Sequence, residues 1–222
     1  MSSGFKQDLF AQFARVGKAL SHGNRLELLE FIAQAERSVE ELATVSGLSI
    51  ANTSQHLQQL RQAGLVKSRK QGLKVYYSLS SNEVITLLGA LRKVAEDHLA
   101  DVEHLVNTYL TVKDDLEPVP REELLKRVKD DLVTVIDVRP WEEYAAGHVP
   151  GAINVPIKDL KTYLQQLDES QEIVAYCRGP HCVLAFDAVL QMRQQGLHAR
   201  RLEDGFPEWK NAGLPVESDH GE

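Results

Sequence analysis

The chain has 222 residues, of which 43% are hydrophobic and 26% are charged, and its formal net charge is −7. This length allows one or two domains, and the composition is typical of a soluble globular protein. No apolar run approaches the roughly 18 residues that a membrane-spanning helix needs, and the N-terminus lacks the apolar core of a signal peptide, so we expect neither a membrane partner nor export.

The charge is distributed unevenly along the chain. Residues 1–112 carry 12 Lys/Arg and 11 Asp/Glu, whereas residues 113–222 carry 13 Lys/Arg and 21 Asp/Glu. This asymmetry indicates that the two halves meet different partners. Between them the acidic stretch VKDDLEPVP (112–120) is typical of a short, stiff linker. We therefore predict two domains, residues 1–111 and 121–222.

Residues 38–64 predict two helices joined by a tight turn. The sequence SVEE provides a capping box, in which Ser38 caps the first helix and Glu41 reaches back to it. Gly47 suits the left-handed residue that ends a helix. Ser49 is the N-cap with which the second helix is expected to begin.

The second helix, SIANTSQHLQQLRQAG (49–64), has two distinct faces. Its apolar face is made of Ile50, Thr53, Leu57 and Leu60. The opposite face is rich in amides and free of acid, with Ala51, Asn52, Gln55, Gln58, Gln59 and Gln62. Asn and Gln can make paired hydrogen bonds to adenine edges in the major groove. A merely solvated face usually mixes Glu with Lys, so we interpret this one as a DNA-reading surface.

The segment LVKSRKQGLKVYYSLS (65–80) predicts a basic β-hairpin. Its second half alternates as a half-buried strand does, and Gln-Gly at 71–72 marks the turn. Helix, turn, helix and basic hairpin make a winged helix, whose hairpin can touch phosphates or the minor groove. We expect DNA contacts from Asn52, Thr53, Ser54, Gln55, His56, Gln58, Gln59, Arg61, Lys67, Arg69, Lys70 and Lys74.

The stretch 15–80 resembles the arsenic-repressor (ArsR) family of bacterial winged-helix regulators. The matching segments are ALSHGNRLELLEFI (19–32), LSIANTSQHLQQLRQAGLV (48–66) and RKQGLKVYYSL (69–79). The resemblance implies a homodimer bound to a palindromic operator in double-stranded DNA. It also implies repression that a ligand usually relieves.

Residues 83–110 predict a single long helix. Apolar or packable residues recur at alternating steps of four and three, which is typical of a coiled-coil-like seam about four heptads long. A core face within one chain would look similar, so the pattern supports packing more firmly than it supports a dimer. The seam consists of Val84, Leu88, Leu91, Ala95, His98, Val102, Leu105 and Tyr109.

Metal sensing, which is common in this family, has weaker support in the sequence. The segment ELATVSGL (41–48) has no cysteine where metalloid sensors place a thiolate pair. Asp97, Asp101 and His104 share a face of the long helix and could bind zinc across a dimer. Solvated carboxylates on an exposed helix face are commoner. We therefore expect no metal and no other cofactor, and we interpret His98 as a packed histidine.

The second half alternates strands with helices, which predicts an α/β domain with a parallel sheet. Strands are expected at VTVIDV (133–138), GAINVP (151–156), EIVAYC (172–177) and ARRLED (199–204). Helices are expected at REELLKRV (121–128), WEEYAAG (141–147), KDLKTYLQQL (158–167) and VLAFDAVLQMRQQG (183–196).

The two cysteines of the chain, Cys177 and Cys182, both lie in the stretch YCRGPHCV (176–183). A disulfide framework needs cysteines scattered over the fold, and a zinc site needs about four ligands at metal spacing, so neither interpretation fits well. Without an export signal, a reducing cytoplasm is the expected compartment, where thiols stay free. Cys177 follows a strand and precedes a helix, at the strand end where parallel sheets carry their reactive loops.

The residues between the cysteines favour a nucleophile. We expect the amides of the loop to face the Cys177 sulfur, backed by the positive end of the next helix, which would stabilise a thiolate. Arg178 and His181 add positive charge or hydrogen bonds at the rim, on either side of Gly179 and Pro180. The alternative is a simple turn beside a buried structural cysteine.

Residues 121–217 resemble the rhodanese (sulfurtransferase) family. The segments DVRPWEEYAAGHVPGAINVP (137–156) and DGFPEWKNAGLPV (204–216) match its two signatures. The resemblance implies that Cys177 forms the persulfide, while Asp137 and Arg139 support the loop.

Two positions depart from the rhodanese pattern. The sixth loop position, often arginine, is Cys182, which argues against efficient thiosulfate turnover. The usual Gly-Gly before the last signature is Asp204-Gly205. The phosphatases that share this fold have a longer loop ending in arginine, and Val183 at that position argues against phosphatase activity.

We hypothesise a transcriptional regulator, with repression the expected mode, that senses reactive sulfur. In this hypothesis Cys177 accepts sulfane sulfur from thiosulfate, a persulfide or a polysulfide. Cys182 then attacks that persulfide, giving a disulfide with release of sulfide, or a sulfur-bridged pair. One alternative is an active sulfurtransferase whose winged helix controls its own operon. Another is a metal- or metalloid-responsive repressor.

Overall fold

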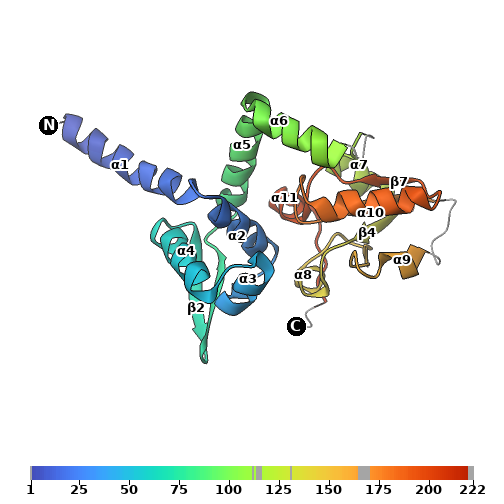
Figure 1. The fold of residues 1–222 in the computed structure, drawn as a ribbon, viewed down its shortest axis with the longest axis horizontal. Helices are drawn as coiled ribbons and strands as arrows, with labels where there is room; N and C mark the ends of the chain where they lie inside the picture. Colours follow the sequence, from blue (N-terminus) through green and yellow to red (C-terminus); the bar gives the residue numbers. More distant parts are fainter. Residues whose placement is uncertain (1, 112, 114–116, 131, 165–170, 220–222) are drawn as a thin grey trace. The chain divides into compact units, whose positions relative to one another are not determined.

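The computed structural model describes residues 2–111, 113, 117–130, 132–164 and 171–219 (Figure 1). The chain divides into two compact units, Met1–Leu88 and Gly89–Glu222, and each is described by itself. The expected linker at 112–120 lies in part outside the described residues, so the domain boundaries placed on either side of it stay a prediction. Within the described residues no helix is long and apolar enough to cross a membrane.

The first unit is a winged helix-turn-helix, as predicted. Its three strands form one antiparallel sheet in the order β1-β3-β2. Strands β2 and β3 make the wing, with a register that runs from Val66 opposite Leu79 to Gln71 opposite Lys74. The elements are α1 (Ser2–Leu20), α2 (Gly23–Gln34), β1 (Arg37–Ser38), α3 (Val39–Ser46), α4 (Ile50–Gln62), β2 (Val66–Gln71) and β3 (Lys74–Leu79).

The signals that begin and end the two central helices are confirmed. Ser38 and Glu41 form both hydrogen bonds of the capping box at the start of α3. Gly47 ends α3 with φ 68°, in the left-handed region that favours glycine. Ser49 then caps α4 by accepting a hydrogen bond from the Asn52 amide. The turn between the helices is therefore fixed by local chemistry.

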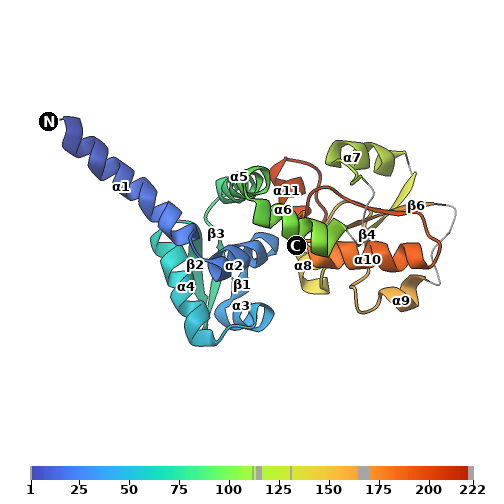
Figure 2. The ribbon, with the colours of Figure 1, turned by 45° about the horizontal axis from the view of Figure 1, so that its top comes forward.

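The helix predicted over 83–110 is not continuous, which corrects the sequence analysis. Helix α5 (Glu83–His98) ends before Leu99, whose backbone is extended with φ −107° and ψ 105°. A second helix, α6 (Ala100–Val106), and a π-helical turn, η1 (Asn107–Thr111), follow after a change of direction (Figure 2). The apolar period is the same whether the helix is straight or resets at one residue, and neither glycine nor proline stands at the break. The eight-residue seam is thus divided between α5 and the segments after it.

The second unit is an α/β domain with a four-stranded parallel sheet in the order β5-β4-β6-β7, as predicted. The predicted helix 158–167 extends into residues outside the described part, and its described portion is the short α9. The strands are β4 (Val133–Asp137), β5 (Ile153–Asn154), β6 (Glu172–Tyr176) and β7 (Ala199–Arg201). The helices are α7 (Arg121–Lys129), α8 (Trp141–Ala146), α9 (Leu160–Tyr163), α10 (Val183–Gln194) and α11 (Phe206–Asn211).

The strand β6 sends alternate side chains into two cores, one on each face of the sheet. Ile173, Ala175 and then Cys177 belong to the core that also contains residues of α9 and α10. Val174 and Tyr176 belong to the core formed with α7, α8 and α11. Because both faces are buried, the sequence of β6 is a continuous apolar run. The same alternation of side chains directs Cys177 toward the α10 side.

Candidate functional site

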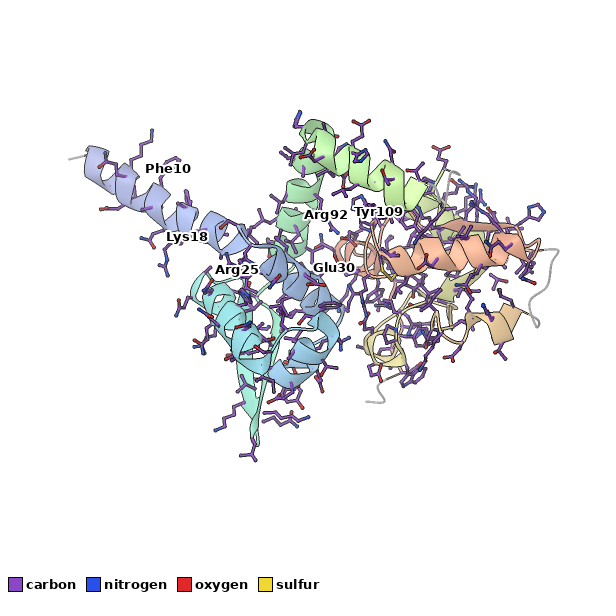
Figure 3. All side chains as sticks on the ribbon, viewed as in Figure 1. Phe10, Lys18, Arg25, Glu30, Arg92 and Tyr109 are labelled. Atoms are coloured by element: carbon purple, nitrogen blue, oxygen red, sulfur yellow. A yellow bond between two sulfur atoms is a disulfide. The ribbon has the colours of Figure 1, made fainter. Side chains whose placement is uncertain are left out.

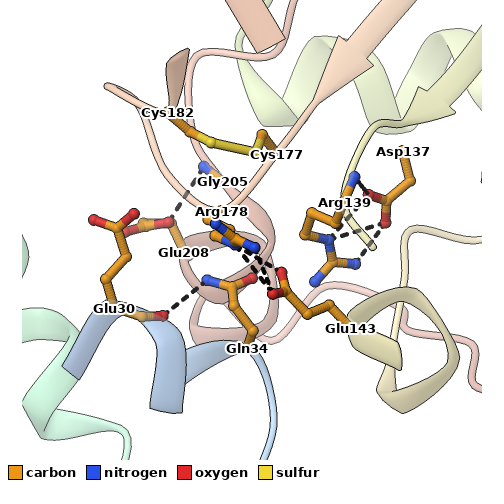
Figure 4. Close-up of a disulfide and its surroundings, with 10 residues drawn as sticks. All are labelled: Glu30, Gln34, Asp137, Arg139, Glu143, Cys177, Arg178, Cys182, Gly205 and Glu208. Carbon is orange, nitrogen blue, oxygen red and sulfur yellow. Dashed lines mark hydrogen bonds and ion pairs between the residues drawn. A yellow bond between two sulfur atoms is a disulfide. The ribbon is translucent and has the colours of Figure 1, made fainter. Parts of the chain in front are cut away.

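The cysteine loop joins the end of β6 to the start of α10. Cys177 directly follows the strand and is 1% exposed, whereas Cys182 is the N-cap residue of α10 and is half-buried. The two sulfurs are bonded to each other, and the Cα atoms are 6.1 Å apart (Figure 4). The sequence predicts free thiols in a reducing compartment. The structure instead holds the pair in its oxidised form.

A buried ion pair lies at the end of the neighbouring strand. The Arg139 and Asp137 side chains are both fully buried, and the Arg139 Nε lies 3.0 Å from one Asp137 carboxylate oxygen and 3.1 Å from the other. Arg139 also donates to the Gly147 carbonyl oxygen at 2.8 Å. Its guanidinium lies 4.3 Å from the centre of the Phe206 ring. The pair is anchored on several sides, as a supporting role requires.

Arg178, expected to add positive charge or hydrogen bonds at the rim, directs its hydrogen bonds to one carboxylate. Its guanidinium binds the Glu143 carboxylate of α8 at 2.8 to 3.1 Å (Figure 4). The Glu143 side chain is fully buried, and the Arg178 side chain is 15% exposed. A buried carboxylate needs a paired cation. Glu143 could not be predicted as a site residue, because an acidic residue in a short helix gives no sign of burial.

His181 lies at the outer side of the loop and contributes little charge at neutral pH. Burial lowers the pKa of its imidazole, and the nearby Arg92 and Arg201 lower it further, against the opposing effect of Glu96. The His181 Nε2 is 3.4 Å from the Glu96 carboxylate. Both Arg92 and Glu96 belong to α5. No pattern in the sequence connects that helix with the loop.

The loop is backed closely by the segment that precedes α11. A Cβ on Gly205 would come within 2.3 Å of the Gly179 nitrogen, so the position has room only for glycine. The next residue, Phe206, donates its backbone N–H to the Cys177 carbonyl oxygen at 3.1 Å. The last rhodanese signature therefore fixes the backbone of the cysteine loop. The orientation of the loop amides toward the Cys177 sulfur stays a prediction.

In the first unit, α4 presents most of the predicted amide face to solvent. Asn52, Gln55, Gln58 and Gln59 are exposed. Thr53 is fully buried in the core beside Leu57 and Leu60, so its expected DNA contact is wrong. Thr53 lies four positions before Leu57 and seven before Leu60, about one and two helical turns, so it shares their face. Ile50, expected on the apolar face, is 57% exposed because it stands in the first turn of the helix.

Two other predicted DNA residues have partners within the first unit. The Gln59 side-chain oxygen accepts a hydrogen bond from Arg25 at 2.7 Å. The His56 ring lies 4.7 Å from the His22 ring, centre to centre. Burial, followed by the charges of His22 and Arg25, lowers the His56 pKa, which favours the neutral imidazole. The side chains of Gln59 and His56 are therefore engaged within the protein, and the exposed side-chain amides of Asn52, Gln55 and Gln58 are better placed to meet DNA.

The wing keeps most of its predicted basic character. Lys67, Lys70 and Lys74 are exposed, whereas the Arg69 guanidinium binds the Glu36 carboxylate at 2.7 Å. The turn residue Leu73 is 99% exposed. Ser54 is half-buried, and Arg61 lies 3.4 Å from the Ser68 hydroxyl across the start of the wing. The lysines are thus the charges of the wing best placed to meet phosphates.

The three residues considered as a zinc site, Asp97, Asp101 and His104, do not lie on one helix. Asp97 lies in α5 and binds Lys93 at 2.8 Å, while Asp101 and His104 lie in α6 beyond the break at Leu99. Their expected common helix face is therefore wrong. Among the described residues, no group of three or more His, Cys, Asp or Glu side chains is arranged to hold a metal ion.

Together the two units define a winged-helix DNA-binding protein that carries a rhodanese-like α/β domain. The profile of the rhodanese-like domain matches residues 120–212, and that of the bacterial regulatory proteins of the arsR family matches residues 22–68. The chain is 46% identical over 212 residues, covering 96% of this chain and 93% of the other, to the HTH-type transcriptional regulator Rv0324 of Mycobacterium tuberculosis. The chain therefore belongs to the arsR family of bacterial transcriptional regulators, as a member with a rhodanese-like domain.

Other similar proteins match one unit each. The uncharacterized HTH-type transcriptional regulator Rv0081 of Mycobacterium tuberculosis is 36% identical over 96 residues, covering 43% of this chain and 84% of that protein. A homodimeric winged helix-turn-helix fragment from Mycobacterium bovis is 40% identical, with a TM-score of 0.42 and coverage of 46% and 94%. A rhodanese-related protein from Thermoplasma volcanium is 27% identical, with a TM-score of 0.42 and coverage of 46% and 98%.

Proposed function

We propose that this regulator senses reactive sulfur through Cys177 and Cys182. The observation that carries the proposal is the bond between the two sulfurs within one six-residue loop of a rhodanese-like domain. In a reducing bacterial cytoplasm, where the regulator would meet its DNA, such a pair is more often transient and redox-sensing than structural. The loop therefore acts as a switch between dithiol and disulfide.

The chemistry proceeds in two balanced steps from the dithiol form. The Cys177 thiolate attacks the sulfane sulfur of a donor RS–SH, the new Cys177 S–S bond forms, and RS⁻ leaves; thiosulfate would release sulfite in the same way. The Cys182 thiolate then attacks the Cys177 sulfur of the persulfide and releases HS⁻. The two thiols are oxidised to a disulfide, and the sulfane sulfur is reduced to sulfide. A cellular dithiol reductant returns the loop to its starting form.

Position 182 and its surroundings favour sensing over repeated turnover. Cys182 stands where an arginine could bind an anionic substrate, and the guanidinium of Arg178 is already paired with Glu143. The second thiol, five residues after Cys177, converts the persulfide to a disulfide. The sulfur is then released as sulfide before it can be transferred to an external acceptor. A catalytic sulfurtransferase would need that persulfide to survive until an acceptor arrives.

We propose that the sensor acts on a homodimer bound to a palindromic operator and that it represses transcription. The exposed amides of α4 and the lysines of the wing supply the DNA contacts. The exposed apolar residues of α1, among them Phe10 and Phe13, supply a surface for a second copy. Oxidation of the loop changes DNA affinity only if it favours one state of the dimer over another.

The experiment compares wild type with Cys182→Ser after one equivalent of an alkyl persulfide. In the variant we expect intact-protein mass spectrometry to show one added sulfur atom that persists. In the wild type we expect that sulfur to be lost as sulfide while two thiols disappear. Equal decay of the added sulfur in both proteins would show that Cys182 does not resolve the persulfide. Rapid transfer to external thiols in the wild type would favour the sulfurtransferase instead.

A further inference from the structure

An arginine side chain lies beside the cysteine loop and comes from a helix outside the rhodanese-like match at residues 120–212. Arg92, which is labelled in Figure 3, lies on α5, and its Nη1 is 3.1 Å from the position that a Cβ on Gly179 would occupy. Gly179 is the second residue after Cys177, so the cation lies against the backbone of the loop. Within the second unit, α5 is thus part of the surroundings of the cysteines.

The hydrogen-bonding capacity of Arg92 is only partly used. Its Nη2 forms an ion pair with Glu208 of α11, and the Glu208 carboxylate also accepts a hydrogen bond from the Gly205 amide at 3.2 Å. The Arg92 Nε is buried and has no hydrogen-bond partner among the described residues. A buried donor without a partner costs free energy. The nitrogen that lies at the loop, where an anion would arrive, is Nη1.

Two other cations near this position, Arg178 and Lys93, bind carboxylates of their own. The side chain of Arg178, within the loop, binds the buried Glu143. Lys93, the next residue on α5, binds Asp97 at 2.8 Å and is largely exposed. Arg92, by contrast, is 28% exposed and lies at the loop. It occupies the place from which a cation can meet a negatively charged molecule that approaches Cys177.

We propose that Arg92 binds the anionic end of the sulfur donor, and that it selects small dianionic donors such as thiosulfate. This rests on the proposed function, because it assigns the donor class of the same loop. A dianion at the loop competes with Glu208 for the guanidinium and offers an acceptor to Nη1. Arg92 also stands on the helix whose first turn packs, through Val84, into the winged-helix core. Donor binding therefore acts on α5 before any sulfur is transferred.

The test measures thiosulfate binding without chemistry, by calorimetry on the full-length Cys177→Ser protein. Adding Arg92→Gln should weaken the affinity about tenfold or more, since a charge-assisted hydrogen bond is lost. Arg92→Lys should restore part of the affinity. Glu208→Gln should tighten binding, because the amide still accepts from Gly205 while the competing charge is gone. Lys93→Gln is the matched control, with the same charge change on the same helix, and should leave the affinity unchanged.

Two results would overturn the assignment: no thiosulfate binding to Cys177→Ser, or equal weakening by Arg92→Gln and Lys93→Gln. A long-chain polysulfide is titrated in parallel, and weakening by Arg92→Gln for polysulfide alone would overturn the preference for thiosulfate. Loading of wild type by an uncharged alkyl persulfide checks the proposed function separately. If that persulfide loads Cys177 while thiosulfate never binds, only the assignment of Arg92 fails. If thiosulfate binds through Arg92 while Cys177 is never loaded, only the proposed chemistry fails.

Discussion

At the scale of single residues, the cysteine loop depends on charges that are buried behind it. Asp137 and Arg139 neutralise each other with both side chains fully buried, and Glu143 does the same for Arg178. Removing one member of such a pair leaves the other charged in a low-dielectric environment. The loop is consequently supported by interactions that are costly to break singly.

This burial leads to a prediction for Asp137→Asn. The variant leaves the Arg139 guanidinium buried without its counter-charge, so we expect the rhodanese-like domain to lose about 3 kcal/mol of stability. Urea unfolding of the full-length protein measures it. The matched control is Glu36→Gln, which breaks an exposed pair with Arg69 and should cost less than about 1 kcal/mol. Equal losses in the two variants would contradict the structural role given to the buried pair.

Residue roles could be predicted where a signature contains them, and not where they depend on distant neighbours. Asp137 and Arg139 stand in the first rhodanese signature, and Cys177 follows a predicted strand within the stretch that resembles that family. The partners of Arg178 and His181 lie far away along the chain, on α8 and α5, and no local pattern indicates them. The departure at Asp204 has a similar explanation, because its carboxylate binds Arg121 of α7 at 2.8 Å.

At the scale of elements, α4 separates its buried and exposed residues as its sequence indicated, with the exposed Ile50 as the exception. The caps that begin α3 and α4 were predictable because a cap is a local interaction between nearby residues. The break at Leu99 was not, because the heptad pattern continues through it and no helix-breaking residue marks it. Periodicity indicates which residues pack, but it does not report the direction of the axis.

The wing provides a prediction about salt dependence. We expect Lys70→Gln and Lys74→Gln each to make the slope of log affinity for operator DNA against log salt concentration shallower by about 1. Each lysine is exposed and each would neutralise one phosphate. Fluorescence anisotropy over a series of salt concentrations measures the slope. Lys161→Gln, on the exposed surface of α9, serves as the control, and an equal change in its slope would exclude a specific role for the wing.

At the scale of the whole molecule, α1 exposes a row of apolar side chains that a lone chain leaves in water. Phe5, Phe10 and Phe13 are each more than half exposed. We predict that Phe10→Asp with Phe13→Asp converts a dimer to a monomer in analytical ultracentrifugation, because two charges would have to be buried at the interface. Leu73→Asp changes an apolar residue on the wing that is even more exposed, at 99%, and should leave the dimer intact. A monomeric wild type would refute the dimer.

The central claim joins the two units: sulfur chemistry at Cys177 changes how the winged helix binds DNA. The most direct measurement is the affinity of the reduced full-length protein for its own upstream promoter fragment, before and after polysulfide treatment, with Cys177→Ser in parallel. We predict a shift of about tenfold or more in the wild type, which corresponds to a coupling free energy of at least about 1.4 kcal/mol, and no shift in the variant. Unchanged affinity in a wild-type protein whose cysteines are shown by mass to have reacted would contradict the claim.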